Sequence, residues 1–525
     1  MTEPCKTYPS LYEEKLQTAT GGITPADRED EYFVRDLVRR MGDSAVFSDG
    51  AAVALFRGER VPLDPADYTL AAHRTGDTWL LPSAFSEKLG VPVPSGVRET
   101  DAADLARAIG CALISDPSRG LCILAAPACE FGARDLDRFS RFFHEPLIPD
   151  VRVPVAETRQ VIAEAPDRGT VTDWRETVYT TCYSPAIHLH RAEGKKQLWV
   201  ANEYSQVKNW REIDTVTVLR VSDDDGRSWR ETVRLPHIRW GGFFEVGGTV
   251  YFSGTSGERH AVAIHRFKSE TEYDVAYIDF GCGWTSPNNV LVDGGRVYQA
   301  LGTAAISAPA GADLLLKESW TVSSSLSPLL TREWFLSASG EETAPRFTVM
   351  EGNILRAPDG KIYNIMRTET QPNSGYAAIL ELTPDGKTYL PVQSCNSLLH
   401  FPTAVSKFVI RQDPVSGEYL SLTSIQTVRG FGDQRSVLAL VHSRDLFRWE
   451  LAEYLLTDRT LMNPVCSAQL HSFQYVDFVI DGDDIRMLVR EAAGNPNTWH
   501  DGTHITLYRI AGFRRYLTGT ERSGT

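Results

Sequence analysis

The feature that most constrains this chain is a hairpin unit that recurs along its C-terminal two thirds. From about residue 171, apolar runs alternate with short turns rich in Gly, Asp, Pro or Asn, and helical periodicity is almost absent. Each unit pairs two apolar strands across a turn and continues through a longer loop into a third strand. The first hairpins begin near Tyr183, Gly242, Pro287, Met350, Ser406 and Phe473.

Successive hairpins start roughly 45 to 70 residues apart, which is typical of four-stranded propeller blades with generous loops. The spacing predicts a mainly β protein with a six-bladed β-propeller over residues 171–525. A seventh blade is the alternative interpretation, in which residues 150–180 and the C-terminus close the ring.

The N-terminal third has a different pattern. Residues 1–44 have helical spacing and predict a helical lead-in, and residues 45–143 predict a small α+β domain of short hairpins and one helix. Residues 144–170 contain four prolines among polar residues and predict a linker. The strand, the turn and Trp79 around residues 76–82 resemble the small stalk-like N-terminal domain of copper amine oxidases. That resemblance implies a scaffold and no copper chemistry.

Composition limits the partners of the 525-residue chain. The net charge of −14 removes the general attraction to phosphate backbones and anionic lipid, so we expect neither nucleic acid nor membrane as partner. No apolar run of membrane-spanning length and no secretory signal is visible, and the eight cysteines form no CxxC pair. We therefore expect a cytoplasmic protein with reduced thiols.

Two short turns contain the most specific sequence motif in the chain. The segment Ser222–Trp229 reads S-D-D-D-G-R-S-W and fits the S-x-D-x-G-x-x-W Asp-box, and Ser443–Trp449 is a degenerate copy. In such a turn the Asp224 carboxylate accepts backbone N–H groups, Gly226 takes a positive φ and Trp229 wedges between sheets. We interpret both turns as structural.

Two arginines stand at equivalent places in different hairpins. Arg367 and Arg490 interrupt apolar runs at the ends of second strands, where both would point toward one central cavity. A bidentate guanidinium there suits a carboxylate ligand. A salt bridge with a neighbouring glutamate, such as Glu351, is an equally open interpretation for each arginine.

The last hairpin and the segment after it contain several side chains that can transfer protons. Tyr475 enters its first strand, and His500 and Asp501 lie in the loop that follows Arg490. An imidazole beside a phenol and a carboxylate can supply a base, a proton donor and an orienting group. A purely structural His500–Asp501 pair is the alternative. His500 and His504 are not on a helix, so we expect no metal site.

Further candidates come from the other blades. Glu203 ends a second strand and Glu351 opens a first strand, so either can serve as the catalytic acid. The remaining candidates for substrate binding are Asn353, Trp240 and Trp284. Signatures of nucleotide, zinc-protease and serine-hydrolase sites are absent, and we expect no cofactor.

The segments SPAIHL, EGNILRAPDGKIYNIMR, SRDLFRW and WHDGTHITLYRI, with the Asp-box, resemble the sialidase-like propeller superfamily. The chain is also similar to the propeller polysaccharide lyases that act on ulvan and on rhamnose–glucuronate linkages. The resemblance implies an arginine cluster that binds an acidic sugar. The R-I-P tripeptide of true sialidases is missing, and Asn202-Glu203 stands where the lyases have His-Asp, so hydrolysis and elimination both stay open.

The functional prediction is an enzyme that cleaves a glycosidic bond in an acidic oligosaccharide containing uronate or sialate. It would act as a sialidase-like glycoside hydrolase or as a polysaccharide lyase. The alternative is a non-catalytic, glycan-binding or scaffold propeller, because this fold carries many functions. The N-terminal domain is also a candidate for homo-oligomer contacts.

Overall fold

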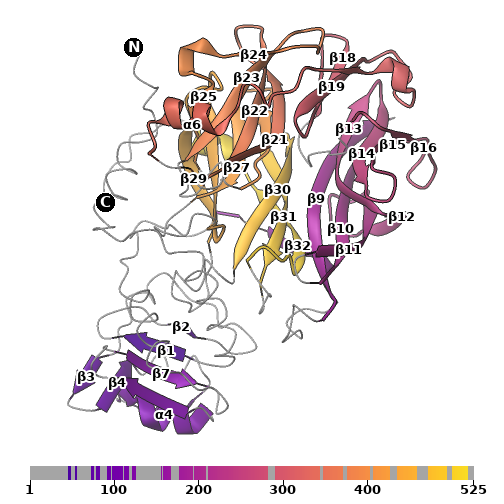
Figure 1. Cartoon of the computed structure of the whole chain (residues 1–525). Helices are drawn as coiled ribbons and strands as arrows, with labels where there is room; N and C mark the ends of the chain where they lie inside the picture. Colours follow the sequence, from indigo (N-terminus) through magenta and orange to yellow (C-terminus); the bar gives the residue numbers. More distant parts are fainter. Residues whose placement is uncertain are drawn as a thin grey trace.

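The computed structural model describes residues 45–48, 54–55, 73–75, 78–82, 91–95, 97, 99–109, 112–116, 121–125, 155–156, 158–166, 177–192, 194–208, 211–281, 290–342, 344, 347–370, 375–402, 406–425, 434–457, 471–493 and 499–517. Within these residues the chain is mostly β-strand, and six antiparallel sheets of four main strands form a propeller (Figure 1). No helix in this part of the chain is long and apolar enough to cross a membrane.

The first three blades follow one another along the sequence. Blade 1 contains β9 (Tyr179–Ala192), β10 (Lys195–Lys208), β11 (Arg211–Ser222) and β12 (Arg230–Pro236). Blade 2 contains β13 (Ile238–Val246), β14 (Thr249–Ser256), β15 (Ala261–Phe267) and β16 (Tyr273–Ile278). Blade 3 contains β17 (Val290–Asp293), β18 (Arg296–Leu301), β19 (Ala304–Pro309) and β20 (Thr321–Val322).

The other three blades complete the ring. Blade 4 contains β21 (Phe347–Arg356), β22 (Ile362–Thr370), β23 (Tyr376–Leu382) and β24 (Tyr389–Pro391), with β25 (Leu398–His400) also paired to β23. Blade 5 contains β26 (Ile410–Gln412), β27 (Tyr419–Ser424), β28 (Val437–Ser443) and β29 (Glu450–Thr457). Blade 6 contains β30 (Ser472–Asp481), β31 (Asp484–Ala492), β32 (His504–Ile510) and β8 (Thr158–Glu164). The predicted hairpins are therefore the first two strands of each blade.

The ring closes through β8, which pairs with the C-terminal strand β32. A strand from the beginning of the propeller thus completes the last sheet, and the described residues form six blades without a seventh. Residues 158–164 were expected in the linker and instead belong to blade 6. The segment contains Thr158, Val161 and Ile162, whose β-branched side chains favour a strand, and it forms this strand by pairing with β32.

The core is divided among the blade interfaces. Each pair of adjacent blades shares its own hydrophobic cluster, for example Trp199 with Phe252 between blades 1 and 2, and Leu440 with Phe478 between blades 5 and 6. The first strand of each blade lies at one edge of its sheet, and β30, β9, β13, β17 and β21 contact one another in succession. The first strands therefore face the centre of the ring.

Helices are few in the described part of the chain. The helix α6 (Arg332–Ser339) follows blade 3; Thr331 caps its N-terminus by accepting a hydrogen bond from the backbone N–H of Trp334. Short 3-10 turns occupy Lys317–Ser319, Gln393–Cys395 and Phe513–Tyr516.

The N-terminal elements form two small sheets and a helix (Figure 1). One sheet contains β1 (Ala45–Ser48), β2 (Ala54–Leu55), β6 (Ala112–Asp116) and β7 (Leu121–Ala125), and the other β3 (His73–Thr75), β4 (Thr78–Pro82) and β5 (Glu99–Asp101). The helix α4 (Ala102–Ile109) buries Ala102, Leu105 and Ala106. These elements agree with a small α+β domain, while the helical lead-in at residues 1–44 lies outside the described residues. The stalk-like resemblance stays a prediction.

Candidate active site

The first strands of four blades carry a similar irregularity. The register shifts in β9, β13, β21 and β30, and in each strand one residue has a left-handed backbone: Ser184, Trp240, Glu351 and Tyr475, with φ between 40° and 53°. A bulge with a positive φ on a residue other than glycine is strained and re-aims the side chain. Such strain gathers at functional sites, so the region of these bulges is the candidate active site.

The second strands supply a matching set of charged residues. Arg367 pairs with Met350, Arg490 with Gln474 and Glu203 with Tyr183, in each case the residue that precedes the bulge. The three side chains therefore occupy equivalent positions in blades 4, 6 and 1. The sequence argument had placed the two arginines at one level, and the registers agree with that placement.

Three arginines surround Tyr475. The Nη1 atom of Arg367 lies 3.4 Å from the Tyr475 hydroxyl, and the Cζ atom of Arg490 lies 3.9 Å from the centre of its ring. The Cζ atom of Arg435 lies 5.4 Å from the same ring. The three arginines come from blades 4, 6 and 5. Side chains from three different blades of the propeller therefore converge on Tyr475.

The two predicted arginines differ in their partners. Arg367 forms a salt bridge with Glu351, with 3.0 Å between Nη1 and Oε2. Arg490 is only 2% exposed, yet its Nε and Nη2 atoms have no hydrogen-bond partner among the described residues. Its guanidinium lies against the Tyr183 and Tyr475 rings instead. Among the residues that the structure describes, the salt-bridge alternative thus applies to Arg367, whereas Nε and Nη2 of Arg490 have no such partner.

His500 lies within this aromatic and cationic cluster. Its ring centre is 5.7 Å from that of Tyr183 and 6.2 Å from that of Tyr475. Burial and then the nearby charges of Arg490, Arg435 and Arg367 hold the pKa of His500 well below its usual range. The imidazole is therefore neutral near pH 7.

Asp501 holds two tyrosines from blade 1. Its carboxylate is 3% exposed and accepts hydrogen bonds from the hydroxyls of Tyr179, at 3.0 Å, and Tyr183, at 3.3 Å. Burial, with Asp501 as the next cause, raises the pKa of Tyr183 well above its usual value. Asp501 therefore positions the aromatic ring on which the Arg490 guanidinium rests.

Glu203 is a buried carboxylic acid. It is 1% exposed, and its Oε1 atom accepts a hydrogen bond from the backbone N–H of Trp240. Burial, helped by the charge of Glu212, raises the pKa of Glu203 to about 8. The group keeps its proton at neutral pH, which is the state required of a general acid.

The three remaining residues predicted to bind substrate differ in their surroundings. Asn353 is fully buried; its Nδ2 atom donates to the Phe408 carbonyl at 3.1 Å and its Oδ1 accepts from the Ile410 N–H at 3.0 Å. These bonds join blades 4 and 5 and give Asn353 a structural contact, while its predicted contact with substrate stays a prediction. Trp240 is covered on its ring by Arg239, at 4.3 Å from Cζ to the ring centre. Trp284 lies outside the described residues.

Sequence reasoning missed two cations of blade 5. Arg435 is 1% exposed, donates to Gln474 and lies with its Cζ 4.6 Å from the centre of the Trp499 ring. Lys407 is also 1% exposed; its Nζ atom has no hydrogen-bond partner among the described residues, and burial lowers its pKa to about 8. The available signal was a single cation set directly before an apolar strand, in QRSVLAL and SKFVI.

The two Asp-box-like turns lie away from this cluster and have local roles. In the first, Asp224 accepts the Ser228 N–H at 2.8 Å, Gly226 has φ +86° and Trp229 packs at the interface of blades 6 and 1. In the second, Asp445 accepts the backbone N–H groups of residues 447 and 448, both at 2.8 Å. These hydrogen bonds and contacts agree with the structural interpretation.

No protein-family model and no curated protein matches the sequence. Among solved structures, the Trypanosoma rangeli sialidase in complex with sialic acid is 12% identical, with a TM-score of 0.39 over 64% of this chain and 55% of that chain. A mutant of that sialidase displaying trans-sialidase activity is 11% identical, with a TM-score of 0.44 over 70% and 61%.

A protein of unknown function from Dyadobacter fermentans is 9% identical, with a TM-score of 0.43 over 68% of this chain and 98% of that chain. The chain spans less than two thirds of the length of the two trypanosomal structures.

Proposed function

We propose that the protein cleaves a glycosidic bond in an oligosaccharide that carries a carboxylate, as a sialidase-like glycoside hydrolase. The observation that carries the proposal is the Arg490 guanidinium, buried with two nitrogen atoms unpartnered among the described residues. Leaving a charge buried and unpaired costs several kcal/mol, and a bound carboxylate would offset that cost with bidentate hydrogen bonds. A neutral sugar would leave the penalty in place.

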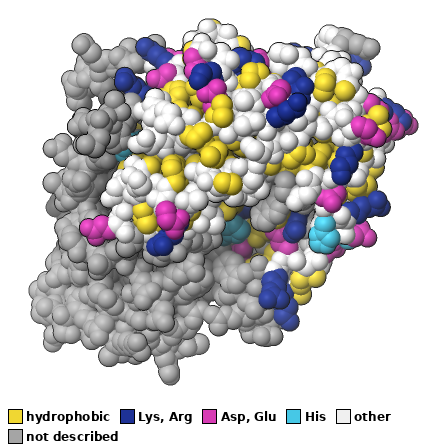
Figure 2. Space-filling model, turned by 45° about the horizontal axis from the view of Figure 1, so that its top comes forward, with side chains coloured by type: hydrophobic (Ala, Val, Ile, Leu, Met, Phe, Trp, Pro, Cys, Tyr) yellow, Lys and Arg dark blue, Asp and Glu magenta, His cyan; other side chains and the backbone are white. Residues whose placement is uncertain are grey.

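The neighbouring cations support an anionic ligand. Arg367 and Arg435 contact Tyr475 from two other blades, and Lys407 adds a further buried ammonium group. The chain as a whole carries a net charge of −14, so this positive cluster runs against its general composition. On the face of the molecule shown in Figure 2, by contrast, Lys and Arg side chains are interspersed with Asp and Glu.

The reacting groups for hydrolysis are a nucleophile pair and an acid. Arg367 Nη1 bonds both the Glu351 carboxylate and the Tyr475 hydroxyl, which sets these two groups side by side. In the proposed reaction Tyr475 attacks the anomeric carbon while Glu351 accepts its proton, and Glu203 protonates the leaving oxygen. Water then releases the sugar from the tyrosine.

A second candidate reaction is elimination at a uronate, and His500 is the observation that favours it. The neutral imidazole beside Tyr475 can accept the proton at C5 while a guanidinium neutralises the uronate carboxylate. Tyr475 would then donate its proton to the leaving oxygen. The product would carry a carbon–carbon double bond in place of an added water.

Mass spectrometry with ultraviolet detection distinguishes the reactions. The purified protein is incubated with sialylated, uronate-containing and neutral oligosaccharides. Hydrolysis gives products that have gained water, and elimination gives an unsaturated uronate that absorbs in the ultraviolet. Binding of acidic glycans without any product would contradict the enzymatic proposal and favour the non-catalytic glycan-binding alternative.

A further inference from the structure

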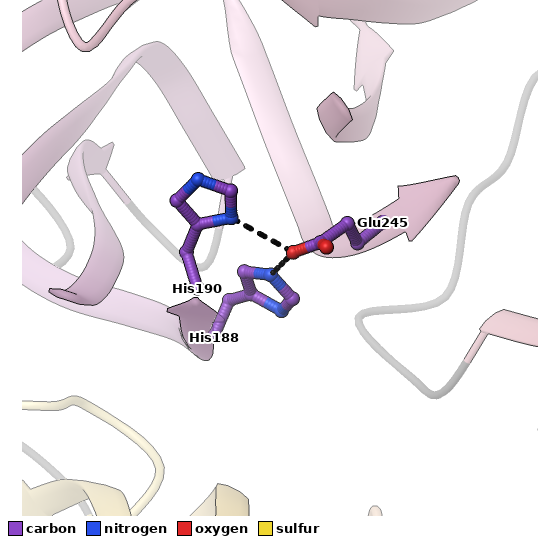
Figure 3. Close-up of side chains that lie close together, drawn as sticks. All are labelled: His188, His190 and Glu245. Atoms are coloured by element: carbon purple, nitrogen blue, oxygen red, sulfur yellow. Dashed lines mark hydrogen bonds and ion pairs between the residues drawn. The ribbon is translucent and has the colours of Figure 1, made fainter. Parts of the chain in front are cut away.

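A second cluster of chemically active side chains lies in blades 1 and 2, toward the end of the strands opposite to the arginine site. His188 Nε2 is 3.0 Å and His190 Nδ1 is 2.9 Å from the same oxygen of Glu245, Oε2 (Figure 3). At about 3.3 Å per strand residue, His188 lies roughly 13 Å along β9 from the Ser184 bulge. The cluster is therefore separate from the arginine site.

The strands bring these three groups together by their alternation. His188 and His190 are two residues apart on β9, so both side chains leave the same face of the sheet. Glu245 lies on β13 of the neighbouring blade, and β9 and β13 contact one another. Figure 3 shows both imidazoles directed at the Glu245 carboxylate from the facing strand. Residues far apart in sequence thus converge on one point.

We propose that His188, His190 and Glu245 bind a divalent transition-metal ion, with Zn²⁺ as the fitting probe. Two neutral imidazole nitrogens and one carboxylate form a donor set that suits zinc and its neighbours in the first transition row. The three ligand atoms already lie within 4.8 Å of one another. A metal with ligand bonds of about 2.0–2.1 Å in tetrahedral geometry needs them about 3.3 Å apart, which is a small adjustment.

The surroundings also fit an ion. The side chains of His188, His190 and Glu245 are 18%, 14% and 27% exposed, so an ion and its remaining water ligands can reach them. Phe243 and Trp199 lie against the two imidazoles, with ring centres 6.2 and 6.3 Å away, and give the site an apolar wall. Such a wall limits competing hydration and orients the ligands.

Zinc titration of the full chain, freed of metal by a chelator and then desalted, tests the proposal. Isothermal titration calorimetry is expected to show one site whose affinity falls more than about 100-fold in His188→Ala and His190→Ala, because removing a ligand exceeds the effect of removing its outer partners. His237→Ala is the matched control, since that exposed histidine pairs with Asp214 at 3.2 Å outside the cluster. Its affinity should equal that of the wild type.

Cobalt substitution identifies the ligands independently. Bound Co²⁺ is expected to give visible absorption bands without the thiolate charge-transfer band that cysteine ligands would produce. Glu245→Gln keeps the size of the side chain while removing its charge, so it tests the carboxylate ligand with little change of shape. Absence of a saturable zinc site in the wild type, or equal zinc affinity in His188→Ala and His237→Ala, would overturn the proposal and leave a hydrogen-bonded clamp between two blades.

Discussion

The two ends of the inner strands use charge in opposite ways. At one end Arg490 is buried with two unpartnered nitrogen atoms among the described residues, while at the other His188 and His190 share the carboxylate of Glu245. Hydrogen bonds from the two histidines hold the pKa of Glu245 to about 2 although partial burial opposes this. The first end is the proposed anion site, and the second is the proposed metal site. The two clusters thus lie on different strands of one propeller, with Arg490 on β31 and the His188–His190–Glu245 cluster on β9 and β13.

The largest contrast is expected between two arginines, the buried Arg490 and the partly buried Arg514. Arg490→Met should reduce kcat/KM on an acidic glycan by at least about 100-fold, because the ligand carboxylate loses its bidentate partner. The same change should leave the free energy of unfolding equal or higher, since it removes an unpaired buried charge. Enzyme kinetics and urea unfolding measure the two effects.

Arg514→Met is the control for that contrast. Arg514 pairs with Asp413, which is fully buried, at 2.6 Å. Removing Arg514 leaves the Asp413 carboxylate without this partner and should lower the free energy of unfolding by about 3–5 kcal/mol. If Arg490→Met destabilises the protein as much as Arg514→Met does, the guanidinium of Arg490 is paired in solution and the anion-site account is wrong.

The next effect concerns Glu203 and pH. Its pKa of about 8 in the folded protein exceeds the usual value near 4.5, so the folded state binds the proton more tightly than the unfolded state. Stability should therefore fall as pH rises from about 4.5 to 8 and then level off, by at most roughly 5 kcal/mol. Glu203→Gln should flatten this slope in unfolding experiments at several pH values.

Activity gives the second measurement on Glu203. As the general acid it must be protonated, so kcat/KM should decline above about pH 8 in the wild type. Glu203→Gln should lower kcat/KM by about 10²–10⁴-fold. Full activity of this variant on a substrate with a poor leaving group would remove Glu203 from the proposed reaction.

Substitution of Asn353 tests whether this residue contributes to stability or to substrate binding. Asn353→Leu leaves the Phe408 carbonyl and the Ile410 N–H buried without their partner, which should cost about 2–4 kcal/mol of stability. The KM for an acidic glycan should stay within twofold of the wild type at temperatures where the variant is folded. A selective rise in KM with unchanged stability would return Asn353 to the binding site.

The smallest effect is expected at the cluster of His188, His190 and Glu245. Glu245→Gln should change kcat/KM on an acidic glycan by less than about twofold, because the cluster lies several strand positions from the arginines. Kinetics in a chelator and with added zinc provide the comparison. A large loss of activity in this variant would show that the two ends are coupled.

The sequence predicted what local patterns determine. The six hairpins, the two capped turns and the equivalent places of Arg367 and Arg490 follow from strand alternation and turn residues, and the structure agrees with them. It raised closure of the ring by residues 150–180 and the C-terminus but placed this closure in a seventh blade, and it did not predict Arg435 or the histidine–glutamate cluster. Those depend on which strands become neighbours after the ring closes, and hydrophobic periodicity contains no information on that. The alternate histidines in SPAIHLHRA were the one local sign of the second site.

The most direct test of the central claim compares matched substrates that differ only in charge. An acidic oligosaccharide cleaved by the protein is chemically reduced at its carboxylate to the alcohol, and both forms are incubated with the wild type and with Arg490→Met. The account predicts that the wild type cleaves the acidic form at least about 100-fold faster than the reduced form, and that this preference disappears in the variant. Equal cleavage of both forms by the wild type would contradict a carboxylate-binding site at Arg490.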